Sequence, residues 1–246
     1  MANWQPAKVS AIKWWTKTLF SLIVKAEVAP FKAGQFTKLA LDTDGKRFSR
    51  AYSYVNAPED PNLEFYLVDV EQGNLSPQLS KLKEGDTVWI NPQPSGFFTL
   101  DEVPASNQIW LLSTGTAIGP FLSMLQSAQI WQQYQQIYLV HGVRKIEDLS
   151  YQPLISQLQH AHSQLKFVSV VSQEENAAGL EGRITERLTD GSLARYFDTS
   201  MSTQDSQFMV CGNPDMVKEV CQILSSQGYA RNRRQQPGQF TVEQYW

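Results

Sequence analysis

Short, largely hydrophobic runs fill the first 100 residues, and polar turn residues with glycine, proline and Asp-Gly separate them. The runs are rich in valine, phenylalanine, tyrosine, leucine and threonine, which is typical of β-strands. Asp44-Gly45 between two such runs predicts a hairpin. Strands at this spacing favour a closed antiparallel barrel or a sandwich. The expected strands are 7–13, 19–26, 35–41, 47–55, 63–70 and 87–92, with one short helix over 75–81.

The pattern changes after the polar segment 101–108, which contains Pro104 and suits a linker. Beyond it, continuous apolar runs alternate with helix-like segments, as in a parallel sheet covered on both faces. We therefore expect two domains: an N-terminal antiparallel β-barrel over 1–100 and a C-terminal α/β domain over 101–246. In the second domain the expected strands are 109–113, 136–141, 166–171 and 207–211, and the expected helices are 119–134, 153–162, 184–188 and 214–227.

Composition narrows the function classes. The net charge of −3 provides no bulk positive charge for nucleic-acid binding. No apolar run reaches the roughly 18 residues of a membrane span, and no secretory signal is visible at the start. Two cysteines, Cys211 and Cys221, indicate free thiols in a reducing, cytoplasmic compartment and are too few for an all-cysteine iron–sulfur cluster. His141, His160 and His162 form no metal-ligand set, so we expect no metal.

The stretch Arg50-Ala51-Tyr52-Ser53 carries the most chemical information. In a strand, Arg50 and Tyr52 point to one face and Ser53 to the other. A flavin dinucleotide needs such a set: a cation for its pyrophosphate, a flat ring against its tricycle and a donor near its reactive nitrogen. An ordinary cross-strand contact between Arg50 and Tyr52 is the alternative.

Two glycine-containing turns suggest phosphate and ligand contacts. Gly73-Asn74-Leu75-Ser76 opens the short helix, whose N-terminus favours a phosphate, and Tyr66 offers a second flat contact nearby. The run 114–120, Thr-Gly-Thr-Ala-Ile-Gly-Pro, follows an apolar strand, where parallel sheets bind ligands. It is only part of a dinucleotide fingerprint. A plain helix cap and a tight turn without a ligand remain alternatives.

Further candidates lie at later strand ends and in the tail. Cys211-Gly212-Asn213-Pro214 ends the last strand, where the thiol either touches a planar ring or is structural. Arg144 and Arg183 suit the extra phosphate of NADPH, or are surface arginines. The tail 240–246 ends on two large aromatics, which we expect to dock on the protein core or on a cofactor.

Taken in order, these segments resemble the ferredoxin/flavodoxin–NADP⁺ reductase family in its compact bacterial form. The resemblance implies a barrel that holds FAD, an α/β domain that binds NADP(H), and electron transfer between NADPH and a one-electron carrier, ferredoxin or flavodoxin. Tyr52 would stack on the flavin, Ser53 would lie near its N5, and Thr116 would face the ring from the other domain. The implied FAD contacts are Arg50, Ala51, Tyr52, Ser53, Tyr66, Val68, Asn74, Leu75, Ser76, Thr116, Tyr245 and Trp246.

On the nucleotide side, Gln173 departs from the resemblance, because close relatives often carry a second arginine there. We expect NADPH to remain preferred over NADH, but less strongly. Ser53, Cys211 and Glu243 are the expected catalytic positions, in a polar positioning role. The implied NADP(H) contacts are Val143, Arg144, Ser172, Gln173, Arg183, Asn213, Pro214 and Asp215.

Two other functions stay open from sequence alone. One is an NAD(P)H-dependent reductase of free flavins, quinones or an oxygenase component, and the other is a nucleotide-binding regulatory subunit without redox turnover. If the partner is ferredoxin or flavodoxin, an acidic carrier needs a basic docking face. The densest basic cluster is Arg231, Arg233 and Arg234, and a second candidate is Lys8, Lys13 and Lys17. We expect a monomer.

Overall fold

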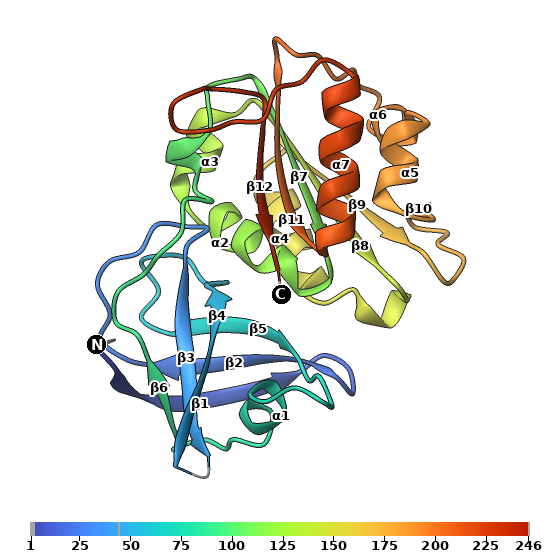
Figure 1. Ribbon diagram of the computed structural model, residues 1–246. Coiled ribbons are helices and arrows are strands. Elements are labelled where there is room, and N and C mark those ends of the chain that lie inside the picture. The colour runs from blue at the N-terminus through green and yellow to red at the C-terminus, as the bar shows by residue number, and fades with distance from the viewer. Residues whose placement is uncertain (1–2, 44, 246) are drawn as a thin grey trace. The chain divides into compact units, whose positions relative to one another are not determined.

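The structure, a computed structural model, describes residues 3–43 and 45–245 (Figure 1). The chain divides into two compact units. The first runs to Thr99 and also takes in Gly119–Ser127, and the second comprises Leu100–Ile118 and the chain from Ala128 onward. The segment Gly119–Ser127, which the sequence placed in the second domain, thus packs with the first unit.

The first unit is a barrel of six antiparallel strands in the order β4-β3-β6-β1-β2-β5. An antiparallel bridge between Tyr54 and Phe65 and a hydrogen bond from Val55 N to Glu64 O (2.9 Å) join the end of β4 to β5, so the two edges meet. The predicted antiparallel barrel is therefore confirmed. Its elements are β1 (Gln5–Trp14), β2 (Leu19–Lys25), β3 (Phe36–Thr43), β4 (Lys46–Ser53), β5 (Leu63–Val68), α1 (Ser76–Leu79) and β6 (Thr87–Ile90).

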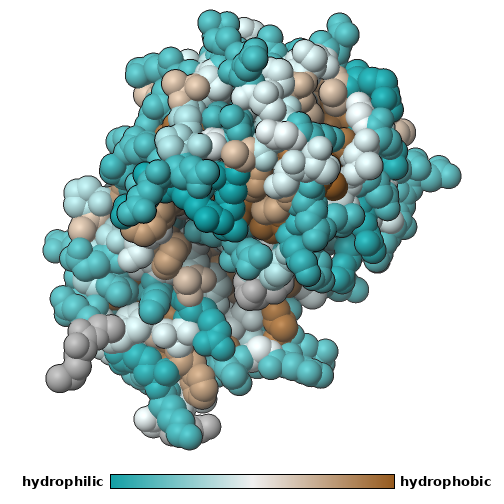
Figure 2. All heavy atoms as spheres, turned by 45° about the horizontal axis from the view of Figure 1, so that its top comes forward, coloured by the Kyte–Doolittle hydropathy of each residue, from teal (hydrophilic) through white to brown (hydrophobic). Residues whose placement is uncertain are grey.

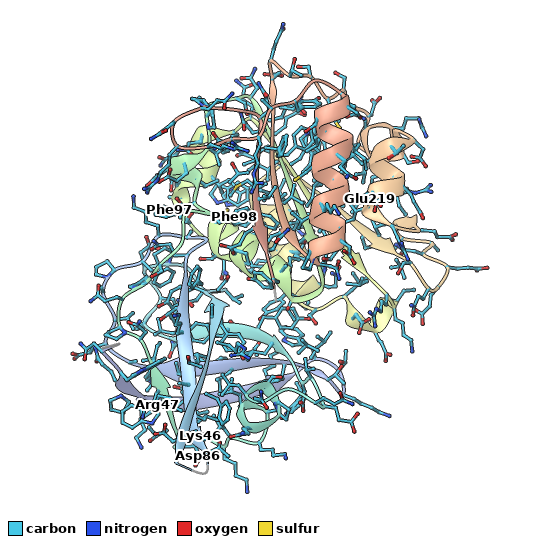
Figure 3. The ribbon with its side chains drawn as sticks, viewed as in Figure 1. Lys46, Arg47, Asp86, Phe97, Phe98 and Glu219 are labelled. Atoms are coloured by element: carbon cyan, nitrogen blue, oxygen red, sulfur yellow. The ribbon has the colours of Figure 1, made fainter. Side chains whose placement is uncertain are left out.

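The predicted hairpin joins β3 to β4, with Thr43 paired to Lys46; Asp44 of its turn lies outside the described residues. Near this turn (Figure 3), Arg47 donates two hydrogen bonds to the Asp42 carboxylate and lies over the Trp89 ring. Inside the barrel, Tyr54 stacks on Phe31 with ring centroids 3.9 Å apart. Alternate strand residues bury the rest of this core, as a period of two requires.

Helix α2 (Gly119–Leu125) is buried along its whole length and belongs to the first unit. Ser123 Oγ donates to Asn56 O (2.7 Å), and the Phe121 ring lies against Phe98. The sequence predicted one helix over 119–134, which is wrong. Ser127 Oγ donates to Met124 O (2.8 Å), a local bond that competes with helix continuation. The chain therefore breaks before α3 (Ala128–Gln133).

The second unit contains a six-stranded, wholly parallel sheet in the order β10-β9-β8-β7-β11-β12. The strand order reverses between β7 and β11, which makes their carboxyl ends the switch point where such sheets bind ligands. The strands are β7 (Gln108–Thr114), β8 (Gln136–Val143), β9 (Leu165–Val171), β10 (Leu180–Glu181), β11 (Ser206–Gly212) and β12 (Phe240–Gln244).

One face of this sheet packs on α5, α6 and α7 (Figure 1). Trp110 and Tyr138 stack there at 4.2 Å between ring centroids, and Phe197, which follows α6, meets both rings. The tail was expected only to dock, but its residues 240–244 form the edge strand β12, paired along β11. The remaining elements are η1 (Leu100–Glu102), η2 (Gly115–Ile118), η3 (Ile146–Asp148), α4 (Gln152–Ala161), α5 (Ile184–Thr189), α6 (Ser192–Tyr196) and α7 (Pro214–Ser226).

The surface in Figure 2 is largely hydrophilic, with hydrophobic residues in small patches. Among the described residues, the large exposed hydrophobic side chains come from separate elements and loops rather than one face, and scattered residues of this kind need no partner. They are Trp14, Val70, Phe97, Ile146 and Tyr196.

Candidate cofactor and nucleotide site

Burial increases along the Arg-Ala-Tyr-Ser tetrapeptide at the end of strand β4. Arg50 is exposed, Tyr52 is half-buried and Ser53 is buried. The Arg50 guanidinium donates to its neighbour's backbone, Ser49 O (2.9 Å), and forms no ion pair with any described residue. Burial raises the pKa of Tyr52 to about 12 and the charge of Arg50 opposes that rise, so the phenol stays protonated beside a cation. Arg50 is therefore available to an anion.

The loop before α1 is held by its own hydrogen bonds. Gly73 N donates to Val70 O (2.6 Å), and Val70 N donates to Ser76 Oγ (3.2 Å). Helix α1 is one turn long, not the 75–81 segment that the sequence predicted, so its dipole adds little to phosphate binding. Asn74 is exposed and Leu75 is buried in the barrel core. On β5, Tyr66 is buried and Val68 is half-buried.

At the switch point of the second unit, the tips of β7 and β11 lie in contact. Asn213 N donates to Thr114 Oγ1 (3.0 Å), and Gly212 has φ +146°. A Cβ at Gly212 would lie 2.1 Å from Thr114 Oγ1, so only glycine fits. Thr116 is buried in the turn η2 that follows β7. The predicted strand-to-helix turn thus lies at the ligand-binding edge of the sheet.

Cys211 and Glu243 are direct neighbours across β11 and β12. Burial, and then the charge of Glu243, raise the pKa of the Cys211 thiol well above its usual value, so it stays protonated and is no nucleophile. Burial raises the pKa of Glu243 to about 7. Its Oε1 is buried without a hydrogen-bond partner among the described residues, and such atoms normally have one.

The end of the tail follows the same edge of the sheet. Tyr245 N donates to Gly212 O (3.0 Å), which carries the chain past the carboxyl end of β11. The predicted aromatic contact of Trp246 lies outside the described residues.

Five of the eight expected NADP(H) residues lie at the carboxyl ends of β8 and β9, namely Val143, Arg144, Ser172, Gln173 and Arg183. Ser172 N donates to Val143 O (3.1 Å), and Gln173 N donates to Arg144 O (3.0 Å), so the two loops run side by side. Gly182 N donates to Val171 O (2.8 Å) and carries Arg183 to the end of β9. Arg144 and Arg183 are both exposed and form no ion pair with a described residue.

Asn213 caps helix α7 rather than leaving its side chain free. Its Oδ1 accepts hydrogen bonds from Asp215 N (2.8 Å) and Met216 N (3.3 Å). Pro214 occupies the first helical turn and Asp215 is exposed. The Asn213 side-chain oxygen is therefore occupied by the helix cap, and the side-chain amide nitrogen can still donate hydrogen bonds to a ligand.

The cluster Arg231, Arg233 and Arg234 precedes β12 and so lies at the amino edge of the sheet, opposite the candidate site of this unit. The sequence analysis considered His141 only as a metal ligand and missed its place in the sheet, where its Nε2 lies 3.0 Å from Gly115 O. The signal that could have revealed it is its place at the end of an apolar strand run, in line with Ser113.

Both units fit the groups that the resemblance implies. In the first, an uncommitted guanidinium, a protonated phenol and a buried hydroxyl share one strand, as a flavin dinucleotide requires. In the second, a switch point with no room for a Cβ at Gly212 lies on the same edge as two uncommitted arginines, as a phosphorylated dinucleotide requires.

Among the described residues, no group of three or more His, Cys, Asp or Glu side chains could hold a metal ion. No helix within residues 3–43 and 45–245 has both the length and the apolar character to cross a membrane.

Comparisons with known proteins agree with this geometry. Residues 10–99 match the oxidoreductase FAD-binding domain family and residues 111–222 the oxidoreductase NAD-binding domain family. The chain is 46% identical to a flavodoxin/ferredoxin–NADP reductase of Escherichia coli, with 100% of both chains covered. It is 32% identical to a ferredoxin–NADP reductase of Pseudomonas aeruginosa, over 99% of this chain and 98% of that one.

A solved structure is also similar over the full length. The crystal structure of a ferredoxin NADP⁺ reductase from Neisseria gonorrhoeae with bound FAD and NADP superposes with a TM-score of 0.94 at 32% identity, and 99% of each chain is covered. These relatives match between 99% and 100% of this chain. The chain belongs to the flavodoxin/ferredoxin–NADP reductase family.

Proposed function

We propose that this protein is a flavoprotein oxidoreductase that binds FAD and NADP(H) and moves electrons between NADPH and ferredoxin or flavodoxin. The observation that carries the proposal is the exposed Arg50 guanidinium, which has no ion-pair partner among the described residues and shares its strand with the protonated phenol of Tyr52. No carboxylate of a described residue competes for this guanidinium. Arg50 therefore remains available for the FAD pyrophosphate.

The first unit supplies the FAD contacts. Arg50 binds the pyrophosphate through its planar donor fork, Tyr52 lies against the flavin ring, and Tyr66 and Val68 provide apolar contact from β5. Ala51 lets the ring system approach the β4 backbone. The loop residues Asn74, Leu75 and Ser76 add backbone N–H donors for phosphate oxygens.

The second unit supplies the nucleotide contacts. Arg144 and Arg183 bind the 2′-phosphate of NADPH, and Gln173 adds a neutral hydrogen bond from the loop that is hydrogen-bonded to Arg144. Val143 and Ser172 line the adenosine side of this edge, and Asn213, Pro214 and Asp215 line the nicotinamide side at the start of α7.

Bound FAD would supply the redox chemistry, a hydride acceptor for NADPH and a one-electron donor for the carrier, and the residues of this chain would hold and orient it. Ser53 donates a hydrogen bond from its buried hydroxyl and holds the ring in position. Cys211 presents a protonated, polarizable thiol, and Glu243 holds or gives up a proton near neutral pH. Thr116 and Tyr245 complete the contacts to the ring system.

We do not place the docking face for ferredoxin or flavodoxin at Arg231, Arg233 and Arg234, because this cluster lies at the amino edge of the parallel sheet. Arg234 also pairs with Glu102 (3.5 Å), whose negative charge partly offsets the positive field of the cluster. A cytoplasmic location is supported by the two free cysteines, Cys211 and Cys221. We further infer that the protein acts as a monomer.

The visible spectrum of the purified protein tests the proposal, recorded before and after NADPH is added without oxygen. We expect flavin bands that NADPH bleaches, and subsequent reduction of flavodoxin or ferredoxin in preference to free flavin. A colourless protein that FAD cannot reconstitute would overturn the proposal in favour of a regulatory subunit. Fast reduction of free flavin alone would instead indicate the other reductase class.

A variant separates the role of Ser53 from the binding of FAD. Ser53→Ala removes the hydroxyl and should slow flavin reduction by NADPH in stopped flow by roughly tenfold, the effect of one lost hydrogen bond in the reacting geometry, while FAD stays bound. Ser49→Ala, a half-buried serine on the same strand, is the matched control and should react at the wild-type rate. Equal rates for all three proteins would remove Ser53 from the mechanism.

A further inference from the structure

His141 is fully buried near the end of β8, and the proposed function does not use it. Its Nε2 lies 3.0 Å from the backbone oxygen of Gly115. A carbonyl oxygen can only accept, so Nε2 carries the hydrogen and donates. Burial lowers the pKa of His141 to about 4, so the ring is neutral under ordinary conditions and keeps this tautomer. Nδ1 is then a bare lone pair without a partner among the described residues.

The strand register aligns His141 with the residues of the site. His141 pairs with Ser113 on β7, Ser113 with Cys211 on β11, and Cys211 with Glu243 on β12. Directly paired residues of parallel strands point to the same face of the sheet. These four side chains therefore form one polar row on the face opposite the apolar core of Trp110 and its neighbours.

The tip of β7 is held from both sides. On one side Asn213 N, after β11, donates to Thr114 Oγ1. On the other side the His141 imidazole donates to Gly115 O. Gly115 has φ +55° and no atom lies within 4 Å of the place where a Cβ would stand, so Gly115 has no side-chain packing of its own. The other residues of the turn, 116–118, are buried, and the His141 imidazole adds a side-chain hydrogen bond to the first carbonyl of the turn.

We propose that His141 is a positioning residue, whose Nε2–H fixes the Gly115–Ile118 turn and thereby the orientation of Thr116 toward the cofactor. The proposal rests on the proposed function, which assigns Thr116 to FAD. A phenylalanine or leucine would fill the same buried space without leaving Nδ1 bare, so packing alone does not account for an imidazole here. The Nε2–H, which points at the Gly115 carbonyl oxygen, accounts for the imidazole.

Two substitutions of His141 separate the donor from the volume. A glutamine places its amide nitrogen at about the reach of Nε2, whereas an asparagine carries the same group on a side chain one bond shorter. We expect His141→Asn to lower the kcat with NADPH and a dye acceptor by about tenfold, with FAD content intact and the KM for NADPH within roughly twofold. His141→Gln should restore most of the rate. Val140→Ala, on the same strand but the opposite face, controls for general loosening.

Hydrogen exchange provides a readout that does not require turnover. Amides of the 114–119 peptide should exchange faster in His141→Asn than in wild type, and near the wild-type rate in His141→Gln. If wild-type protein shows no NADPH oxidation, the proposed function fails, but the exchange result still tests the anchor. Equal exchange and equal kcat in wild type and His141→Asn would overturn the role of His141. So would a His141→Gln protein as impaired as His141→Asn.

Discussion

At Glu243, burial leaves a carboxyl group with one unpartnered oxygen among the described residues and a pKa raised to about 7, against an ordinary value of 4.5. The direct neighbour Cys211 gives no help, because a protonated thiol is a weak donor. A group in this state gains and loses its proton within the working pH range of the enzyme. The same property must appear in the stability of the protein.

We expect the stability of the protein to fall as pH rises from about 5 to about 7.5, in part through Glu243. The folded state keeps this proton up to pH about 7, whereas the unfolded chain releases it near the ordinary value. The folded state thus binds more protons in this window, so the free energy of unfolding decreases with rising pH, by at most about 3 kcal/mol.

Urea unfolding of wild type and Glu243→Gln at pH 5 and pH 8 measures this effect. The variant carries no titrating group at this position, so its stability should change less between the two pH values. Glu219→Gln, an exposed position on α7 (Figure 3), is the matched control and should behave as wild type. Identical pH dependence in wild type and Glu243→Gln would refute the assignment.

The preference for NADPH over NADH should depend on Gln173. Its backbone is fixed beside Arg144, so a longer cationic side chain at this position would reach the same phosphate. Gln173→Arg replaces a neutral hydrogen bond by a charge-assisted one and should raise the ratio of kcat/KM for NADPH over NADH by about tenfold. Ala177→Arg adds the same charge to an exposed position of the same loop and should leave the ratio within about twofold. An unchanged ratio in Gln173→Arg would contradict the placement of the 2′-phosphate.

At the scale of the elements, substitution of Gly212 tests whether the tips of β7 and β11 must stay in contact. Alanine there combines a left-handed φ of +146° with a Cβ 2.1 Å from Thr114 Oγ1, so the tips of β7 and β11 must separate. We expect Gly212→Ala to lower the Tm by more than about 5 °C, roughly the effect of 2 kcal/mol in a chain of this size, and to weaken NADP⁺ binding.

Gly228→Ala is the matched control for backbone strain, because its φ of +89° is also positive but its nearest neighbour is 4.0 Å away. It should lower the Tm less and leave NADP⁺ binding unchanged. Calorimetry and NADP⁺ titration of both variants decide the point. Equal losses in the two would mean that strain alone, and not the contact with Thr114, limits position 212.

Most strands could be predicted from sequence because each carries its own signal. The barrel strands are rich in branched and aromatic residues between turn residues, and β7, β8, β9 and β11 are largely apolar runs. The two-residue strand β10 is too short to leave a pattern. Strand β12 carries only a short alternation of apolar and polar residues over 240–243, which does not reveal its pairing along β11. The arrangement of the site likewise depends on register: no local pattern places His141, Ser113 and Cys211 in one row.

In the whole molecule, the chain passes between the two units at residues 99–100, 118–119 and 127–128. The sequence predicted one crossing near residue 100, because composition changes there, but contacts rather than composition decide where α2 packs. Gln126 Nε2 donates to Val55 O (2.8 Å), and Ser123 donates to Asn56 O. The first unit is therefore complete only with a segment that lies beyond the start of the second.

We expect a fragment that ends at Thr99 to lack cooperative folding. Without residues 119–127 the Phe98 ring loses its contact with Phe121, and the carbonyl oxygens of Val55 and Asn56 lose these side-chain donors. Two large side chains are worth about 3–6 kcal/mol of burial, which is comparable with the roughly 5–15 kcal/mol that typically stabilises a domain. Circular dichroism during heating and quenching of FAD fluorescence measure folding and FAD binding.

The matched control joins the same fragment to residues 119–127 through a flexible Gly/Ser linker of about ten residues. This chimaera should melt cooperatively and bind FAD more tightly than the fragment, because residues 119–127 restore the two side-chain donors to the carbonyl oxygens of Val55 and Asn56 and the aromatic contact. A fragment ending at Thr99 that melts as sharply as the chimaera would show that α2 only covers a barrel able to fold alone. In that case the domain boundary near residue 100 would describe the folding units better than the contacts do.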